Sequence, residues 1–301
     1  MKILISGGSG FVGSNLTTLL MEKGHDVTVM SRNPGKGSSL PPQVKTLAAD
    51  AMKPGPWQAE LALHDSVVNL AGVSINKRWD ENHKKMLRDS RIMTTRNVVN
   101  ALSSKKNRVT TLVNASGVGI YGYTKDEELT EKAPSGGTDF LSKLAQDWEN
   151  EAIKGKDYGV RLVIARIGIV LGKDGGALAE MTKPFRFFVG GPLGDGKQWF
   201  PWIHVRDLCG AILFSIENST MSGPMNCSAP NPVRNSDLAK AIGKALGRPS
   251  FMPAPAFMIR LILGEFGSVI LEGQRAIPKA LLDNGFKFEF TNINDALRDI
   301  L

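Results

Sequence analysis

Cysteine is scarce in this chain, and its two cysteines are not arranged for chemistry. Cys209 and Cys227 both lie in apolar surroundings, without the spacing of a metal site. A small disulfide-stapled fold and a cysteine-based metal centre are therefore excluded. We expect two buried free thiols in a reducing compartment, and no other pattern in the sequence predicts a bound metal.

Long hydrophobic runs are also missing. The most apolar late stretch, residues 257–271, is short and is interrupted by Arg260 and Glu265, so no transmembrane span is predicted. Met1 leads directly into the first expected strand, which leaves no room for a leader peptide ahead of it. We therefore expect a soluble, cytoplasmic protein with no membrane partner.

Acidic residues are outnumbered, with 29 Asp and Glu against 37 Lys and Arg and a formal net charge of +8. The excess is spread in short groups such as Lys84-Lys85. It does not form a basic stripe interleaved with aromatic residues, so a nucleic-acid partner is not expected. An anionic cofactor or substrate can use part of this positive charge.

Glycine is abundant, and its most informative pattern stands near the start of the chain. The pattern is G-x-x-G-x-x-G, formed by Gly7, Gly10 and Gly13. It follows an apolar run at residues 3–5 and opens an apolar pattern of helical spacing. Glycine lets the backbone approach a pyrophosphate, and a helix N-terminus attracts its charge. A dinucleotide site including Phe11 and Val12 is therefore predicted, the alternative being a glycine turn without a ligand.

The end of the second expected strand indicates which dinucleotide is bound. NAD sites carry an acidic residue there for the ribose 2′-hydroxyl, whereas this chain has Ser31 and Arg32. A hydroxyl and a permanently charged guanidinium suit a 2′-phosphate. We therefore predict NADP(H), although Arg32 could instead be a solvated residue at a strand end.

Strand and helix patterns alternate through the first half of the chain. This alternation predicts an α/β fold, a Rossmann-type doubly wound parallel sheet that binds ligands at the carboxyl ends of its strands. The expected strands are residues 3–5, 26–30, 44–47, 66–70, 110–115 and 161–167. The expected helices include residues 79–104, 140–152, 235–247 and 257–272.

After Gly172 the sequence becomes rich in glycine loops and aromatic residues. This change predicts a smaller lobe that places the substrate. We assign residues 1–172 and about 205–230 to an NADP(H)-binding Rossmann domain. Residues of about 173–204 and 231–301 are assigned to the smaller C-terminal substrate lobe.

Several segments resemble the extended short-chain dehydrogenase/reductase superfamily. They are the glycine turn, Asn69 to Gly72, Ala115 to Gly122, Arg166 to Gly172 and Phe200 to Asp207. Other segments are similar to its atypical "epimerase family" branch, the YfcH-like proteins: Arg78-Trp79, Ser90-Arg91, Gly190 to Pro192, Trp202 to His204, Pro253 to Arg275, and Leu281 to Phe290. The resemblance implies a Rossmann fold, NADP(H) binding and a C-terminal substrate lobe, without a known substrate.

The catalytic groups of that superfamily are only partly matched. Its members carry a Tyr-x-x-x-Lys pair, in which the lysine holds the ribose and lowers the tyrosine pKa. Here Lys143 matches, but Asp139 stands at the tyrosine position. The usual serine position falls on Gly117, with Ser116 one residue earlier. Asp139 is a candidate base or, alternatively, a helix N-cap and an i,i+4 partner of Lys143.

Tyrosine is rare, with three in the chain, so the search for a replacement acid is short. Tyr158 precedes the sixth expected strand and is expected to be structural. Tyr121 and Tyr123 follow the fifth strand and are candidate acids over the nicotinamide. The alternative is that both rings simply pack under the lobe.

Further cofactor contacts are expected near the carboxyl ends of the strands. They are Leu70, Ala71 and Gly72 on the adenosine side, Asp50 and Ala51 beside the adenine, Arg91 at a phosphate, and Val170 at the nicotinamide. A solvated helix face is an equal alternative for Arg91.

A substrate pocket is expected in the lobe. By location alone, its candidates are Arg186, Lys197, Gln198, Trp199 and His204. In the resembling segment such a histidine usually supports the loop while Asp207 caps the next helix, so a structural role for His204 is favoured over a catalytic one.

Two functions are compatible with these residues. The first is an NADP(H)-dependent oxidoreductase or epimerase-like enzyme acting on a small carbonyl or sugar-nucleotide substrate. The second is a catalytically silent NADP(H)-binding protein that acts through a protein partner, because the usual serine and tyrosine are not matched. Some plastid and cyanobacterial relatives of the branch are linked to division control. A homodimer is a further expectation.

Overall fold

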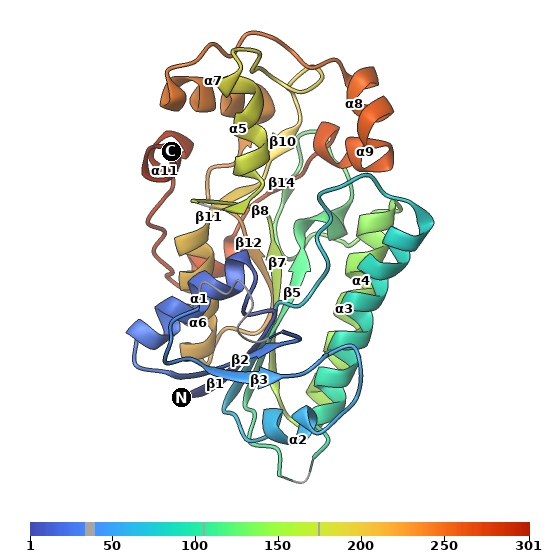
Figure 1. Cartoon of the computed structure of the whole chain (residues 1–301), viewed down its shortest axis with the longest axis vertical. Coiled ribbons are helices and arrows are strands. Elements are labelled where there is room, and N and C mark those ends of the chain that lie inside the picture. The colour runs from blue at the N-terminus through green and yellow to red at the C-terminus, as the bar shows by residue number, and fades with distance from the viewer. Residues whose placement is uncertain (34–39, 105, 174) are drawn as a thin grey trace.

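A seven-stranded parallel sheet forms the centre of the molecule, with the strand order β12-β7-β5-β4-β1-β2-β3 (Figure 1). The computed structural model describes residues 1–33, 40–104, 106–173 and 175–301. The strands are β1 (Lys2–Ser6), β2 (Asp26–Ser31), β3 (Lys45–Ala48), β4 (Ser66–Asn69), β5 (Thr111–Gly117), β7 (Arg161–Ile167) and β12 (Gly223–Cys227). The order reverses between β1 and β4, the switch point at which doubly wound sheets bind ligands. The predicted fold class is confirmed.

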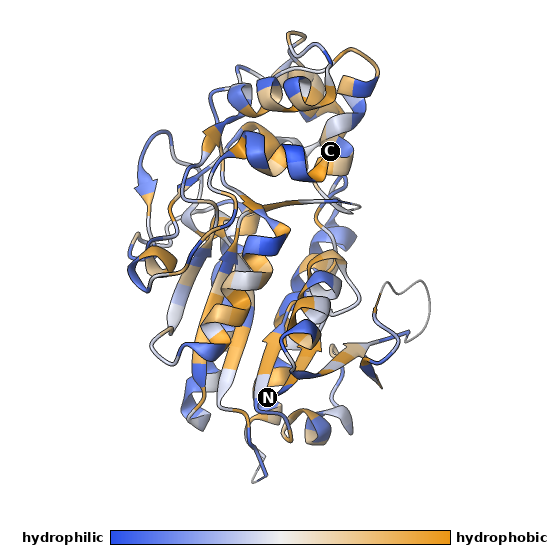
Figure 2. Cartoon of the chain, turned by 90° about the vertical axis from the view of Figure 1, so that its left-hand side faces the viewer, coloured by the Kyte–Doolittle hydropathy of each residue, from blue (hydrophilic) through white to orange (hydrophobic). Residues whose placement is uncertain are grey.

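Helices cover both faces of this sheet, because its strands are apolar on both sides. Ile3 and Ile5 pack in one core cluster, whereas Leu4 between them packs in another. In Figure 2 the central strands are largely hydrophobic, while many residues on the outer helices are hydrophilic. The covering helices are α1 (Phe11–Glu22) and α6 (Val205–Glu217) on one face, and α2 (Trp57–Leu61), α3 (Glu81–Ala101) and α4 (Phe140–Ile153) on the other.

The smaller lobe lies beyond the carboxyl ends of the strands (Figure 1). Its strands and the short strand pair at its base are β8 (Ile169–Gly172), β9 (Gly175–Gly176), β10 (Trp199–Phe200), β11 (Trp202–His204), β13 (Val233–Arg234), and β6 (Glu128–Leu129) paired with β14 (Arg275–Ala276). Its helices are α5 (Leu178–Arg186), α7 (Asn235–Leu246), α8 (Ala256–Leu263), α9 (Glu265–Leu271) and α11 (Ile293–Ile300). The remaining elements are η1 (Val118–Tyr121), η2 (Lys154–Tyr158) and α10 (Lys279–Asp283). Trp202 is fully buried in the core of the lobe.

Several expected elements differ from those in the structure. The helix expected over residues 257–272 is wrong as one element, because Gly264 has a φ of +60° and separates α8 from α9. The helix expected from residue 79 begins at Glu81, because the Asp80 side chain accepts a hydrogen bond from His83 N at 2.7 Å and caps it.

The predicted division into two domains stays a prediction, and two elements cross its boundaries. β8, assigned to the Rossmann domain, pairs with β11 and β9 in a lobe sheet. Leu281 on α10, assigned to the lobe, is fully buried in the main core beside β12.

Candidate functional site

The glycine turn between β1 and α1, called the glycine cradle below, is packed closely against neighbouring backbone. Gly7 has a φ of +73°, and a Cβ on it would lie 2.9 Å from the backbone N of Ala71. A Cβ on Gly13 would lie 2.3 Å from the carbonyl oxygen of Gly7. The N-cap of α1 is Gly10, which offers no side-chain acceptor. The first N–H groups of α1 therefore lack an intrahelical partner and can bind an anion.

Phe11 has a second role that the sequence did not reveal. Its ring lies against the end of β8 and the start of β9, where a Cβ on Gly175 would approach it to 2.2 Å and one on Gly172 to 2.7 Å. The side chain of Phe11 therefore fastens the lobe to the glycine turn. Only its backbone remains suited to the predicted cofactor contact.

A chain of buried polar side chains fixes the strand ends beneath the cradle. Ser6 on β1 donates to Asn69 Oδ1 on β4, and Asn69 Nδ2 donates to Asn114 Oδ1 on β5 at 2.7 Å. Asn69 Nδ2 also lies 2.9 Å from Thr95 Oγ1. These bonds tie the carboxyl ends of three neighbouring strands together, and satisfied buried networks of this kind rigidify a site.

Arg91 supplies a half-buried positive charge beside the cradle. A Cβ on Gly72 would lie 3.2 Å from its Cζ, and its guanidinium stands over the Trp148 ring at 5.2 Å. Arg91 Nη1 donates to the carbonyl of Leu87, and no carboxylate pairs with it in the described part of the chain. Burial lowers the pKa of Arg91 to about 10, so it is charged at neutral pH. Because Gly72 follows Ala71, which packs on Gly7, Arg91 lies near the glycine turn.

The other predicted adenosine contacts surround the same strand ends. Leu70 N donates to Ser6 O at 3.0 Å, Asp50 Oδ1 accepts from Met52 N at 3.1 Å, and the Ala51 carbonyl accepts from Asn97 at 3.0 Å. An open hollow of ≈ 870 Å³ borders Asp50 but extends along β3 and α2.

The residues predicted to select the cofactor lie at the end of β2. Ser31 Oγ accepts a hydrogen bond from Asn33 N at 3.3 Å. Arg32 is exposed and stands just before residues 34–39, which lie outside the described residues. Val170 lies in β8 opposite Ile203 of β11, at the base of the lobe.

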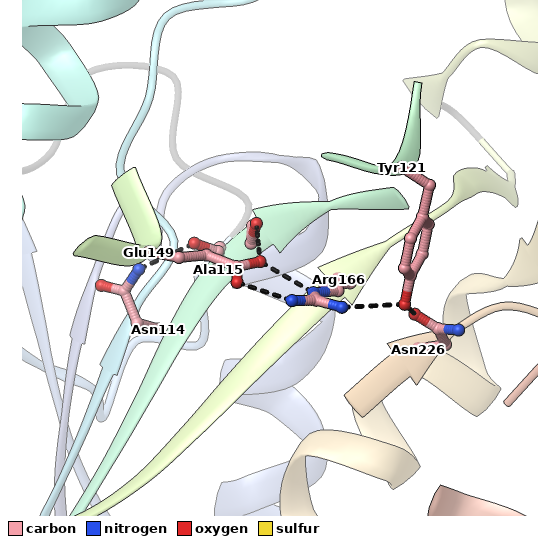
Figure 3. Close-up of polar contacts among 7 residues, drawn as sticks. Asn114, Ala115, Tyr121, Glu149, Arg166 and Asn226 are labelled. Carbon is pink, nitrogen blue, oxygen red and sulfur yellow. Dashed lines mark hydrogen bonds and ion pairs between the residues drawn. The ribbon is translucent and has the colours of Figure 1, made fainter. Parts of the chain in front are cut away.

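A buried ionic network joins β5, α4, β7 and β12 (Figure 3). Ser116 Oγ donates to Glu149 Oε1 at 2.7 Å, and Arg166 donates to both carboxylate oxygens of Glu149 at 2.9 and 2.8 Å. Arg166 Nη1 also donates to the Tyr121 hydroxyl at 2.9 Å, and that hydroxyl donates to Asn226 Oδ1 at 2.7 Å. Every hydroxyl and charge in this network therefore has a partner.

This network bears on two of the catalytic candidates. Tyr121 is 5% exposed, and burial raises its pKa more than the nearby Arg166 lowers it. The contacts favour the packing alternative for Tyr121 and give Ser116 a structural hydrogen bond. Glu149 and Asn226 were not singled out in the sequence, and Glu149 lies among other polar residues that give no signal of its burial.

Asp139 caps α4, as one of its two alternatives predicted. Asp139 Oδ1 accepts from Leu141 N at 3.0 Å and Ser142 N at 3.1 Å, and its other oxygen accepts from Ser142 Oγ. The expected ion pair with Lys143 is wrong: Lys143 is exposed and forms no salt bridge with any described residue. The Asp139 carboxylate is therefore used in capping α4, while the Lys143 ammonium group is available to contact a ligand.

Tyr123 is the more accessible of the two candidate acids. Its side chain is 37% exposed, and its hydroxyl has no hydrogen-bond partner among the described residues. Burial raises its pKa, and the carboxylates of Asp139, Glu272 and Glu265 raise it further. The phenol is therefore protonated at neutral pH.

The lobe candidates lie on different elements and make different contacts. Arg186 is exposed at the far end of α5, and Lys197 is exposed in a turn. Gln198 Nε2 donates to the carbonyls of Leu193 and Ile270, which anchors α9. Two guanidinium groups lie over the Trp199 ring. The Cζ atom of Arg234 is 3.9 Å from the ring centroid, and that of Arg275 is 4.9 Å from it.

His204 is buried, and its contacts are those of the structural role that was favoured over a catalytic one. Its Nδ1 accepts from Arg206 N at 3.1 Å and caps α6, its Nε2 lies 3.2 Å from Asp299 of α11, and its ring stacks on Phe290 at 3.9 Å. Burial lowers its pKa to about 4.

Asp207 does not cap α6, because its carboxylate accepts from Glu289 N and Phe290 N at 2.7 and 3.0 Å. No cluster of three metal-ligating side chains occurs among the residues described, and none of their helices is long and apolar enough to cross a membrane.

The sequence matches two family models. The first is described as the NAD dependent epimerase/dehydratase family and covers residues 3–227. The second, a domain of unknown function, covers residues 254–300, which include α8 to α11.

Relatives of known name match over the whole chain. The chain is 39% identical to the chloroplastic epimerase family protein SDR39U1 homolog of Arabidopsis thaliana, over 100% of this chain and 87% of that protein. It is 38% identical to the epimerase family protein YfhF of Bacillus subtilis, over 100% and 98%.

Among solved structures, human epimerase family protein SDR39U1 with NADPH matches with a TM-score of 0.88 at 36% identity, covering 100% of this chain and 99% of that one. A nucleoside-diphosphate sugar epimerase from Corynebacterium glutamicum matches with a TM-score of 0.80 at 32% identity, covering 99% and 57%. With its glycine cradle at the switch point of a parallel sheet, the chain belongs to the NAD dependent epimerase/dehydratase family.

Proposed function

We propose that the crevice between β1 and β4 binds NADPH, and that the chain is an NADP(H)-dependent oxidoreductase or epimerase-like enzyme for a small carbonyl or sugar-nucleotide substrate. The observation that carries this proposal is Arg91. It is a half-buried cation with no carboxylate partner in the described residues, beside a glycine turn whose open N–H groups favour an anion. Burying a charge without a partner is costly, so a bound phosphate is the natural counter-charge.

The preference for NADPH over NADH rests on the end of β2. Ser31 and Arg32 stand where NAD-binding sheets place a carboxylate for the ribose 2′-hydroxyl. Arg32 carries a permanent charge and a planar set of donors that match a phosphate. The human relative solved with NADPH supports the same choice.

The chain's own residues position the cofactor and handle a proton. NADPH supplies a hydride when it is bound. Lys143, exposed on α4 and without a carboxylate partner among the described residues, is the candidate to hold the nicotinamide ribose. Tyr123 is the candidate proton donor, because its phenol is accessible and protonated, whereas the Tyr121 hydroxyl is already shared between Arg166 and Asn226.

A second function is favoured by the same contacts. Ser116 is bound to Glu149, Tyr121 to Arg166 and Asn226, and Asp139 to the end of α4. These bonds occupy three of the five candidate catalytic groups. The alternative is therefore an NADP(H)-binding regulatory protein whose partner recognises the loaded state. Capture of a partner that depends on NADPH would favour it, whereas turnover of a substrate that is lost in Tyr123→Phe would exclude it.

A calorimetric titration with NADPH and with NADH tests the binding proposal. We expect NADPH to bind at least about tenfold more tightly than NADH, a difference of about 1.4 kcal/mol. Arg32→Ala should reduce NADPH affinity to the NADH level. Arg91→Gln should weaken both cofactors alike if it holds the pyrophosphate, which both contain. Arg298→Ala, which removes an exposed arginine on α11, is the matched control.

Failure of both cofactors to bind the folded wild-type protein would overturn the proposal. Equal affinity for NADPH and NADH would retain the crevice as a dinucleotide site but overturn the role of Arg32.

A further inference from the structure

Large apolar side chains are exposed at one end of the lobe. Half of the exposed large apolar residues in the described part of the chain gather there, on α8 and on two turns beside it. They are Phe187, Phe188, Val189, Phe251, Met252, Phe257, Met258, Leu261 and Ile262, with exposed fractions of 45–76%. We call this set the apolar tip. Soluble monomers rarely expose so many neighbouring apolar groups without a function for them.

The two turns of the apolar tip lie side by side, and α8 directly follows the second turn. Met252 N donates to the Gly190 carbonyl at 3.2 Å, and Leu193 forms a β-bridge with Ala254, so the two turns run side by side. Arg248 Cζ lies 4.6 Å from the centroid of the Phe188 ring. α8 begins just after these contacts, at Ala256. In Figure 1, α7 and α8 lie at the end of the lobe farthest from β1, β2 and β3.

The α8 helix exposes mostly apolar side chains to solvent. Seven of its eight residues are apolar, yet Ile259 is its single buried residue. Phe257, Met258, Leu261 and Ile262 lie one turn apart in pairs and share one exposed face. Gly264, with a φ of +60°, ends the helix and turns the chain back into α9, which packs through Phe266 against Trp79. α9 is therefore fastened to the molecule while α8 projects.

Basic residues predominate in the segments that carry the apolar tip, and Glu180, Asp195, Asp237 and Glu265 lie at the borders of those segments. Residues 181–194 and 238–264 contain six Lys or Arg and no Asp or Glu. Four of these cations form no ion pair with any residue that the structure describes: Arg186, Lys244, Arg248 and Arg260. A helix with exposed Phe and Leu, flanked by basic side chains, has the composition of segments that lie in the interface of anionic membranes.

We propose that the apolar tip docks the protein on an anionic membrane surface, with α8 and the phenylalanine turns entering the headgroup region. The basic side chains around it contact lipid phosphates. A second copy of the chain fits less well, because a two-fold interface would bring the same cations face to face. The absence of a spanning segment, from which no membrane partner was expected, does not oppose peripheral attachment.

Co-sedimentation with vesicles tests this proposal on the full-length protein. The probes are vesicles of phosphatidylcholine alone and of equal parts phosphatidylcholine and phosphatidylglycerol. We expect binding to the mixed vesicles that weakens as salt is raised, because salt screens the attraction to the lipid charge. Binding to phosphatidylcholine alone should be at least about tenfold weaker, because it lacks that electrostatic attraction.

Two variants separate the apolar and electrostatic parts. Phe257→Ser with Leu261→Ser should reduce binding to the mixed vesicles about tenfold or more, because it removes the apolar area that membrane binding would bury. Arg248→Glu with Arg260→Glu should reduce it and abolish the preference for anionic lipid. Ile153→Ser with Leu282→Ser, at exposed apolar positions outside the tip, is the matched control. Thermal unfolding confirms that each variant is folded.

Three results would overturn the proposal. They are no binding to the mixed vesicles, binding that the Phe257 and Leu261 substitutions leave unchanged, or a dimer in sedimentation velocity that those substitutions dissolve. The last result would assign the apolar tip to a second copy.

Discussion

Individual buried charges distinguish the structural residues from the candidate functional ones. Arg166 and Glu149 form a bidentate pair whose side chains are each 7% exposed, and their neighbours complete every remaining bond. Burial by itself would lower the pKa of Arg166, but Glu149 and Tyr121 raise it overall. Arg91 is also sheltered but has no such partner among the described residues. The charge of Arg166 is therefore already neutralised within the protein, whereas the charge of Arg91 is suited to an anionic ligand.

Removing one partner of the buried pair should be far more costly than breaking a surface pair. We expect Glu149→Gln to lower the free energy of unfolding by about 3–5 kcal/mol, because it leaves the Arg166 charge buried and unpaired. Arg88→Gln breaks the exposed pair with Asp147 and should cost less than about 1 kcal/mol. Urea unfolding of the two variants measures the difference. Similar losses in both would show that the buried network is not structural.

The sequence predicted residue positions better than residue partners. Gly7, Gly10 and Gly13 could be interpreted because their pattern, the preceding strand and the following helix are local. The roles of Tyr121 and Ser116 could not, because their partners Asn226 and Glu149 are distant in the chain and meet them only in the folded sheet. The contact of His204 with Asp299 could not be predicted for the same reason, since Asp299 is contributed by the last helix.

At the level of elements, capping side chains decide where helices begin, and one of them also connects two helices. Asp80 and Asp139 set the starts of α3 and α4. Gly264 divides an apolar run that helical spacing alone predicted as one helix. His204 does two things at once, because it caps α6 through Nδ1 and contacts α11 through Nε2. The link between the Rossmann helices and the lobe therefore depends on a histidine that accepts a hydrogen bond.

This link should make stability depend on mildly acidic pH. The pKa of His204 is about 4 in the folded protein, against an ordinary value near 6.5. Between these values the unfolded chain binds a proton that the folded chain does not, so stability falls as the pH falls from about 6.5 to about 4. His204→Asn keeps a cap acceptor but cannot titrate, so its urea midpoint should change less over this range. An unchanged pH slope in the variant would contradict this role.

At the level of the whole molecule, the chain places its candidate chemistry at the boundary between two layers of structure. The parallel sheet presents the glycine cradle, the polar strand ends and Arg91 at its carboxyl edge. The lobe contributes β8 and the carboxylates near Tyr123, and Phe11 fastens the two parts together. The parallel sheet, with its ligand site at the carboxyl ends of the strands, followed from the alternating sequence pattern, which is local. The sequence also predicted a smaller lobe but not its internal arrangement, because its short strands and helices depend on contacts between distant loops.

The central claim is that the crevice between β1 and β4 holds NADPH, and a crystal structure of the protein with NADPH tests it most directly. We expect the pyrophosphate on the N–H groups at the start of α1, a cofactor phosphate within reach of Arg91, and the 2′-phosphate beside Ser31 and Arg32. A cofactor bound elsewhere, or one whose phosphates avoid both the glycine turn and Arg91, would contradict the claim.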